Sequence, residues 1–253
     1  MDLGLAERVF VVTAASSGLG RATAEQLVAE GSRVVLVARR ADALDEVVAA
    51  LGREHAVALT ADLADVSTAE AACALALEVF GRLDGALISV GGPPAGTVLD
   101  TTADQWRAAF DSVFLAGLRV AEAVVRHGTS PDLALAWVLS TSVKAPIPGL
   151  AASNGLRPGL AMLIKQLADE LGPQGTRVLG LMPGRIETDR VQHLDNLADD
   201  PAAARASAES DIPLRRYGQP AELGRVAAFL LSPAASYLTG SMIAVEGGAL
   251  RSL

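Results

Sequence analysis

The sequence predicts a single α/β domain, with a doubly wound parallel sheet and helices on both of its faces. Short β-branched runs alternate with longer segments rich in Ala, Leu, Glu and Arg, which is typical of βαβ units. The strand segments are apolar on both faces, as a buried parallel sheet requires. The length of 253 residues suits one large domain, and no internal repeat or linker divides the chain, so we assign residues 1–253 to one domain.

The expected elements follow one another along the whole chain. The first four are a strand over 8–12, a helix over 20–30, a strand over 33–37 and a helix over 41–51. Further strands are predicted at 56–59, 86–89, 133–140, 177–182 and 242–245, with helices in the gaps. Two of these helices begin with capping boxes, Ser67 with Glu70 and Thr102 with Gln105, in which each side chain bonds the partner's backbone N–H.

An irregular stretch, residues 187–211, follows the sixth predicted strand. It is rich in Asp and Ala and contains Pro201. Because ligands bind outside the carboxyl ends of the strands in such sheets, we expect this stretch to be a mobile lid over the substrate. An ordinary surface excursion fits the sequence equally well.

Composition and charge argue against several classes of function. No apolar run approaches the length of a membrane span, and Asp2 and Glu7 stand where a secretory leader carries positive charge, so we expect a soluble, cytoplasmic protein. A net charge of −8 without a Lys/Arg block argues against nucleic-acid binding. The three histidines lie far apart, so no metal is expected. The single cysteine, Cys73, is expected to be a buried thiol without a catalytic role.

The first strand leads directly into the first helix through the run Thr13-Ala14-Ala15-Ser16-Ser17-Gly18-Leu19-Gly20. Phosphates bind backbone N–H groups at a helix N-terminus, and a Cβ at the points of closest approach would block them, which explains Gly18 and Gly20. A glycine motif between a strand and a helix, at the start of repeated βαβ units, favours a dinucleotide site. We therefore expect Thr13 and residues 16–20 to bind a dinucleotide.

Several further motifs along the chain accompany the glycine motif of residues 13–20. They are Asp62-Leu63 after the third strand, Gly91-Gly92 after the fourth, Pro183-Gly184-Arg185-Ile186-Glu187-Thr188 after the sixth, and the carboxyl-terminal segments 212–222, 238–240 and 245–248. In this combination, and over nearly its whole length, the chain resembles the short-chain dehydrogenase/reductase family. Its glycine motif reads Thr-Gly-x-x-x-Gly-x-Gly, and Ala14 stands here at the first glycine.

The resemblance implies a Rossmann-type sheet in the strand order 3-2-1-4-5-6-7. It also implies hydride transfer between a nicotinamide cofactor and a small carbonyl or hydroxyl compound, as in 3-oxoacyl reductases, and a homo-oligomer that is either a tetramer or a dimer. It assigns further cofactor contacts to Asp62, Leu63, Gly91, Pro183, Gly184, Ile186 and Thr188.

The end of the second strand, Val37-Ala38-Arg39-Arg40, indicates which nicotinamide cofactor binds. NAD-binding proteins usually place an acid there to accept from the ribose 2′-hydroxyl, and this chain has Ala38 instead. Arg39 can pair bidentately with a 2′-phosphate. We therefore expect NADP(H) rather than NAD(H), although Arg39 could instead be a solvated loop cation beside Asp42.

The catalytic residues that the resemblance implies are only partly present. The family uses a serine, a tyrosine thirteen residues later and a lysine four residues after that, and these places hold Ser140, Ser153 and Arg157. A serine hydroxyl is a weaker acid than a phenol and is shorter by a ring. Arg157 cannot titrate, but it can still donate to the nicotinamide ribose. Tyr217 and Tyr237 both lie in carboxyl-terminal family patterns, so neither replaces the missing acid.

Lys144 offers a replacement proton donor. It follows Ser140 by four residues, in the loop expected to border the substrate cleft, and a partly desolvated ammonium titrates near neutrality. An exposed loop lysine is an equally good interpretation. Together with Arg157, Arg185 and Arg190, it predicts a positive pocket and hence an anionic substrate, such as a carboxylate or a phosphate-bearing thioester.

Three functions remain open at this point. The resemblance favours an NADP(H)-dependent oxidoreductase, in which Ser140 orients the substrate oxygen and Lys144 or a bound water moves the proton. A redox-inactive nucleotide-binding sensor or scaffold would explain all the catalytic replacements together. A lyase or isomerase would use Lys144 as a base without net hydride transfer.

Overall fold

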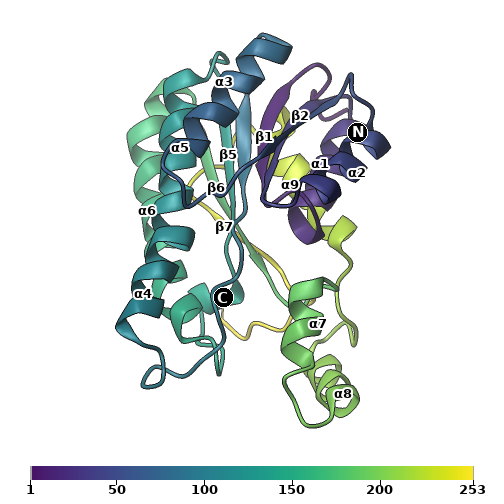
Figure 1. The fold of residues 1–253 in the computed structure, drawn as a ribbon, viewed down its shortest axis with the longest axis vertical. Coiled ribbons are helices and arrows are strands. Elements are labelled where there is room, and N and C mark those ends of the chain that lie inside the picture. Colours follow the sequence, from purple (N-terminus) through teal and green to yellow (C-terminus); the bar gives the residue numbers. More distant parts are fainter. Residues whose placement is uncertain (1, 253) are drawn as a thin grey trace.

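The computed structural model describes residues 2–252, and Figure 1 shows their arrangement. The helices and strands are β1 (Val9–Thr13), α1 (Gly18–Ala29), β2 (Arg33–Ala38), α2 (Ala41–Leu51), β3 (Ala56–Thr60), α3 (Thr68–Phe80), β4 (Gly85–Ile88), α4 (Ala103–Ala109), η1 (Phe110–Leu115), α5 (Ala116–His127), β5 (Ala134–Val138), η2 (Thr141–Val143), α6 (Ala151–Leu171), η3 (Gly172–Gln174), β6 (Arg177–Pro183), α7 (Asp189–Asp195), α8 (Pro201–Asp211), α9 (Pro220–Leu231), η4 (Pro233–Ala235) and β7 (Met242–Val245). Within this part of the chain, none of the helices combines the length and the apolar character needed to cross a membrane.

The strands form one parallel sheet in the order β3-β2-β1-β4-β5-β6-β7, which confirms the predicted fold class and strand order. The chain first builds the sheet outward from β1 to β3, and then returns to place β4 on the other side of β1. The direction of building therefore reverses between β1 and β4. In open α/β sheets, ligands bind beside such a reversal, outside the carboxyl ends of the strands.

Helices cover both faces of the sheet (Figure 1). Because side chains alternate along a strand, Phe10 and Val12 of β1 belong to the core shared with α1, α2 and α9, whereas Val9 and Val11 belong to the core shared with α3, α5 and α6. The expectation of burial on both faces holds for the central strands. It is wrong for the edge strands β3 and β7, which are partly exposed because each has a neighbour on one side only.

Of the two predicted capping boxes, one forms and one does not. Thr102 and Gln105 make both reciprocal bonds at the start of α4. The prediction for Ser67 is wrong, since its side chain makes no capping bond. Its N–H and Oγ instead donate to the Asp65 carboxylate, at 2.9 and 2.8 Å, and this local turn replaces the box.

Residues 187–211, which were expected to be irregular, contain the two helices α7 and α8. The prediction of an irregular stretch is therefore wrong. The Thr188 side chain accepts from Val191 N at the start of α7, and Asp200 accepts from Ala203 N at the start of α8. Pro201 occupies the first turn of α8, where the missing N–H has no intrahelical partner to lose. Figure 1 shows both helices beyond the carboxyl ends of the strands.

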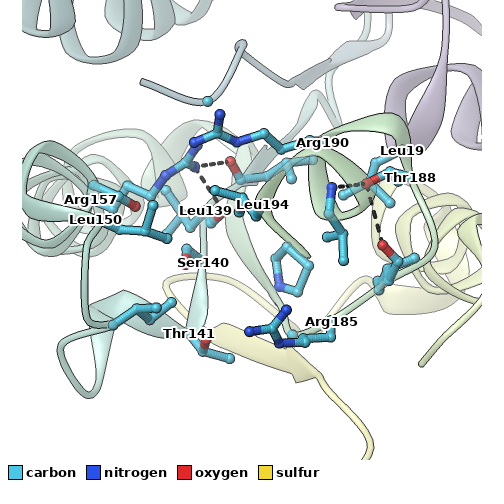
Figure 2. A pocket seen from close by; sticks show the side chains of 18 of the residues that line it. Leu19, Leu139, Ser140, Thr141, Leu150, Arg157, Arg185, Thr188, Arg190 and Leu194 are labelled. Carbon is cyan, nitrogen blue, oxygen red and sulfur yellow. Dashed lines mark hydrogen bonds between the residues drawn. The ribbon is translucent and has the colours of Figure 1, made fainter. Parts of the chain in front are cut away.

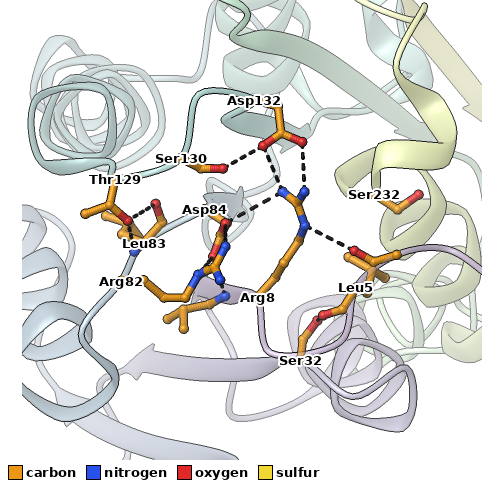
Figure 3. A network of polar contacts seen from close by, with 12 residues as sticks. Leu5, Arg8, Ser32, Arg82, Leu83, Asp84, Thr129, Ser130, Asp132 and Ser232 are labelled. Carbon is orange, nitrogen blue, oxygen red and sulfur yellow. Dashed lines mark hydrogen bonds and ion pairs between the residues drawn. The ribbon is translucent and has the colours of Figure 1, made fainter.

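A network of charged groups joins the amino ends of three strands (Figure 3). The fully buried Asp84, just before β4, accepts from Val9 N at 2.8 Å and from Arg82 Nε at 2.7 Å. Arg8, just before β1, donates to both oxygens of Asp132, just before β5, at 3.1 and 2.8 Å. Arg8 also lies 3.6 Å from Asp84. These contacts hold β1, β4 and β5 together at the amino ends of the strands, opposite the carboxyl ends at which ligands are expected to bind.

Candidate functional site

A cleft of about 790 Å³ opens at the carboxyl ends of β1, β4, β5 and β6, with α6 and α7 at its sides. The residues predicted for the site that line this cleft are Ser17, Gly18, Leu19, Gly20, Gly91, Ser140, Ser153, Arg157, Pro183, Gly184, Ile186 and Thr188. Those predicted for the site that lie outside it are Thr13, Ser16, Arg39, Asp62, Leu63 and Lys144.

The glycine loop leaves backbone N–H groups available at the start of α1. The side chain of Ser17 does not cap this helix, and its first turn carries no acidic residue. A Cβ on Gly20 would lie 2.5 Å from the carbonyl oxygen of Ala14, so only glycine fits there. Across the cleft from Gly18 lies Thr188, whose Cγ2 would be 3.4 Å from a Cβ at that glycine. An uncapped helix N-terminus lined by glycines suits the diphosphate of a dinucleotide.

Thr13 supports the glycine loop rather than lining the cleft. It is fully buried, and its Oγ1 donates to the carbonyl oxygen of Ser89 at 2.6 Å and accepts from Ser89 N at 2.8 Å. These bonds join the carboxyl end of β1 to that of β4, the two strands between which the sheet reverses.

The residues predicted for the adenosine end meet on the surface beside the cleft. Arg39 Nη1 lies 3.9 Å from Asp62 Oδ2, and both side chains are mostly exposed. Arg39 is thus paired with Asp62 and not with Asp42. Arg40 Nη2 lies 3.5 Å from Ser16 Oγ, which brings a second arginine beside the glycine loop. Arg40 was not among the predicted site residues, although it follows Arg39 directly in the sequence.

Three serines gather near the end of β5. The Ser140 Oγ accepts from Ser142 N at 3.1 Å and so caps the short helix η2. This turn places the Ser142 Oγ 3.1 Å from the Ser153 Oγ, where both side chains are buried. Ser142 was missed in the sequence analysis, because its spacing from Ser153 matches no family pattern and only the turn reveals the contact.

Arg157 lies one helical turn after Ser153 on α6 and is only 7% exposed. Its Nη1 donates to the carbonyl oxygens of Val138 and Leu139, both at 2.8 Å (Figure 2). Burial, and to a lesser extent the neighbouring charge of Arg190, lower the pKa of Arg157 to about 10. The guanidinium therefore stays charged at neutral pH.

Arg190 and Arg185 also line the cleft, whereas Lys144 is exposed and lies outside it. Arg190, on α7, donates to the carbonyl oxygen of Pro93 at 2.7 Å, and burial lowers its pKa. Arg185 pairs with Asp195, which also accepts from the buried Tyr217 hydroxyl at 3.1 Å. Three of the four cations expected around the cleft are therefore present.

One helical segment beside α6 contributes apolar side chains to the packing. It is the π-helix η1, in which Val113 is buried and the Phe110 and Phe114 rings stack with their centroids 4.9 Å apart. A Cβ on Gly159 would lie 3.2 Å from the Phe114 ring, so this ring packs closely against α6. η1 therefore supplies packing to α6 and no polar group at these positions.

Within residues 2–252, no three His, Cys, Asp or Glu side chains are grouped so that they could hold a metal ion. Cys73 is buried on α3, as predicted. Burial raises the pKa of its thiol to about 12, so the thiol is not ionised at neutral pH.

A family model described as enoyl-(acyl carrier protein) reductase matches residues 13–249 of the chain. The chain is similar to 2,5-dichloro-2,5-cyclohexadiene-1,4-diol dehydrogenase of Sphingobium indicum. The two sequences are 32% identical over 249 residues, which cover 96% of this chain and 97% of that protein.

Two solved structures share the fold over almost the whole chain. L-sorbose reductase from Gluconobacter frateurii, complexed with NADPH and L-sorbose, superposes with a TM-score of 0.94 at 28% identity and covers 100% of both chains. A short chain oxidoreductase from Pseudomonas aeruginosa, described as containing an atypical catalytic center and solved with NADPH bound, superposes with a TM-score of 0.89 at 30% identity and covers 98% of both chains.

Proposed function

The chain belongs to the short-chain dehydrogenase/reductase family, and from this membership we propose that it is an NADP(H)-dependent oxidoreductase that acts on a small carbonyl or hydroxyl compound. The observation that carries the proposal is the uncapped, glycine-lined start of α1, at the point where the sheet reverses. The NADPH in both similar structures supports the choice of cofactor.

Each part of the cofactor has residues of suitable chemistry. The N–H groups of residues 17–20 would hold the diphosphate, and Arg39, with Arg40 beside it, would hold the 2′-phosphate. Asp62 and Leu63, outside the cleft, would contact the adenine, while Gly91 and the loop 183–188, which line it, would contact the nicotinamide. When bound, the nicotinamide supplies or accepts the hydride.

Ser140 is the residue proposed to orient the substrate oxygen. One lone pair of its Oγ is engaged by Ser142 N–H, so its own O–H remains available for donation to that oxygen. The positive charge of Arg157, one helical turn beyond Ser153, stabilises negative charge that develops on the oxygen as a hydride adds to carbon. A serine hydroxyl and a guanidinium do not release a proton readily at neutral pH. We therefore propose that a water molecule in the cleft donates the proton that the substrate oxygen accepts.

Lys144 remains the alternative proton donor, and its exposure outside the cleft predicts that it is dispensable. We expect Lys144→Met to change kcat/KM by less than about twofold, because Lys144 is exposed and does not line the cleft in which the substrate is proposed to bind. A loss of more than tenfold, with the Kd for NADPH unchanged, would assign the proton transfer to Lys144 instead.

The segment 187–211 is proposed to cover the substrate as a lid. Supporting this role, Arg190, Val191 and Leu194 of α7 line the cleft, so movement of this helix would change access to it. The type of substrate that we propose is a 3-oxoacyl or related carbonyl compound with a negative charge. The arginines of the cleft support the negative charge, and the family model, described as an enoyl-(acyl carrier protein) reductase, supports an acyl group.

A cytoplasmic homo-oligomer, either a tetramer or a dimer, is also part of the proposal. The assembly is supported by an apolar groove of about 480 Å³ between α5 and α6, which includes Leu118, Val125, Leu167 and Leu171. Light scattering of the purified protein would test the assembly, and a monomer at micromolar concentration would contradict it.

The proposed activity is tested by following the absorbance of reduced nicotinamide with a panel of ketones, ketoesters and alcohols. We expect NADPH oxidation or NADP⁺ reduction with at least one of them, and a preference for the phosphorylated cofactor. Tight NADPH binding without turnover across the panel would support a nucleotide-bound sensor, which the replacement of the tyrosine by Ser153 favours.

A further inference from the structure

Two arginines of the cleft have no carboxylate within 4.0 Å among residues 2–252, although Asp189 and Asp211 also line the cleft. Arg157 and Arg190 form no ion pair there, and their hydrogen-bond acceptors are the peptide carbonyls of Val138, Leu139 and Pro93. Arg185 differs, because it lines the same cleft but is neutralised by Asp195. Among the arginines that line the cleft, only Arg157 and Arg190 therefore lack an ion-pair partner within the described chain.

The fold holds these two charges in an unfavourable setting. Arg157 is nine-tenths buried, and Arg190 is partly buried and close enough to Arg157 to lower its pKa. Removing a cation from water without a counter-charge costs stability, and a like charge nearby adds to that cost. An anion bound between the two guanidinium groups would relieve both effects.

Arg157 also has hydrogen-bond donors to spare. Both of its bonds come from Nη1, so Nε and Nη2 have no acceptor among the described residues. Neither atom is a fully buried donor without a partner, so both retain some solvent-accessible surface. Arg157 also lines the cleft. Figure 2 shows that Arg157 and Arg190 enter the cleft from opposite sides.

We propose that Arg157 on α6 and Arg190 on α7 together bind the carboxylate of an anionic substrate. This inference rests on the proposed function and specifies the substrate class of its cleft. The cofactor's diphosphate already has the start of α1, and a ribose hydroxyl is neutral, so neither removes the need for an anion here. A planar guanidinium matches the geometry of a carboxylate, which it binds through two parallel N–H groups.

The test compares each acid with its methyl ester, so that size and shape stay matched while the charge is removed. Calorimetry on the NADP⁺-loaded protein in a Hepes buffer, with no oxidisable alcohol present, measures binding without turnover. The pairs are pyruvate with methyl pyruvate and acetoacetate with methyl acetoacetate, up to 10 mM. We expect at least one acid to bind about tenfold or more tightly than its ester.

Arg190→Met is the principal variant, since Arg190 is partly exposed and its loss leaves the core intact. It should weaken the binding of the acid by about tenfold to a hundredfold and leave the ester within about twofold. Arg53→Met is the matched control, because it removes the same charge from an exposed turn after α2 and should not change the ratio between acid and ester. Arg157→Lys, which keeps the charge but loses the planar fork, should weaken acid binding as well.

Equal affinities for acid and ester in the wild-type protein overturn the inference. So does an Arg190→Met protein that keeps the ratio between acid and ester but loses affinity for NADP⁺, since the arginines would then serve the cofactor. If NADP⁺ itself fails to bind, the proposed function fails. The same pairs, titrated into the free protein, then decide the carboxylate site separately.

Discussion

Ala14 holds a backbone conformation that side-chain-bearing residues rarely adopt. Its φ of 50° lies in the left-handed region, at the turn that leads from β1 toward the glycine loop. For an L-amino acid this region costs about 1–2 kcal/mol through crowding of Cβ against the backbone. The backbone is thus slightly strained in the loop on which the proposed binding of the cofactor depends.

Replacing this residue tests the strain. We expect Ala14→Gly to raise the free energy of unfolding by about 0.5–1 kcal/mol, because relief of the left-handed strain exceeds the entropy that glycine adds to the unfolded chain. Urea denaturation measures it. Ala15→Gly is the control: this buried neighbour is not among the residues with positive φ, so the same change should destabilise the protein. Destabilisation by both substitutions would contradict the argument.

Arg39 is the residue on which the choice between the two nicotinamide cofactors depends. We expect Arg39→Ala to weaken NADPH binding by about tenfold to a hundredfold, through loss of a charge-assisted contact, and to leave NADH within about twofold. Fluorescence titration of both nucleotides measures it, with Arg53→Ala as a control for net charge. A parallel loss of affinity for NADH would place Arg39 outside the 2′-phosphate contact.

Spacing along the chain predicted much of the candidate site at the level of single residues. Gly18, Gly20, Ser140, Ser153 and Arg157 all line the cleft, because turns and helical repeats convert fixed separations into fixed positions. Spacing did not predict the contact of Ser142 with Ser153, or the exposure of Lys144. Both depend on how η2 and its following loop pack, which local sequence does not determine.

Among the elements, α7 and α8 are held to the body of the molecule by a few polar contacts. Arg205 on α8 donates to both carboxylate oxygens of Glu187, which precedes α7, at 3.0 and 2.6 Å, and to Glu209 of its own helix at 2.9 Å. Its guanidinium also lies 4.6 Å from the centre of the Tyr217 ring. These helices bury none of their own residues fully, so their position depends on such contacts rather than on a core.

This attachment should depend on pH. Hydrogen bonds from Arg205 hold the pKa of Glu187 below its ordinary value of 4.5. A carboxylate with a lowered pKa in the folded state contributes its full stabilisation above the ordinary value, and loses it as the pH falls through the lowered one. We therefore expect amide hydrogen exchange in α8, corrected for its intrinsic rate, to accelerate below about pH 4.5.

Glu187→Gln should remove that acceleration and give fast exchange in α8 at neutral pH. Glu25→Gln, which breaks an exposed pair with Arg21 on α1, is the control and should leave α8 unchanged. If the wild-type protein and Glu187→Gln exchange alike across this pH range, the ion pair of Glu187 with Arg205 does not hold α8 in place.

Element types were predictable wherever periodicity was strong, and less so where polar side chains decide the local structure. The central strands and α2 follow the expected ranges closely because burial imposes their patterns. The two helices within 187–211 were missed, since their apolar periodicity is weak and their starts depend on the caps Thr188 and Asp200. The Ser67 box failed because Asp65 offers a nearer acceptor.

Across the whole molecule, the charged network around Asp84 lies at the opposite end of the sheet from the cleft. We expect Asp84→Asn to lower the free energy of unfolding by about 3 kcal/mol, because it leaves Arg8 and Arg82 beside a buried neutral group. Affinity for NADPH should change by less than about twofold. Urea denaturation and nucleotide titration measure the two quantities.

Asp132→Asn is the comparison for this prediction, since the Asp132 side chain is 43% exposed. We expect a loss of about 1 kcal/mol or less, because water screens the ion pair. Equal losses for the two substitutions would contradict the importance of burial at Asp84.

The architecture as a whole was predictable for two separate reasons. The alternation of strand and helix patterns indicates a parallel sheet with two covered faces, and the structure has one core on each face. The strand order came from the resemblance to a family, because periodicity carries no information about which strands are neighbours. The exposure of β3 and β7 follows from the strand order and could have been inferred with it.

Arg157 and Arg190, which lack an ion-pair partner in the described part of the chain, affect the choice of buffer for assays that screen substrates. Phosphate and sulfate are small enough to enter the cleft, and by mass action they would compete there with the anionic substrate that we propose. Assays in phosphate buffer, or on protein freshly precipitated with ammonium sulfate, would then report an inflated KM. Bulky zwitterionic buffers of low ionic strength suit the first screens best.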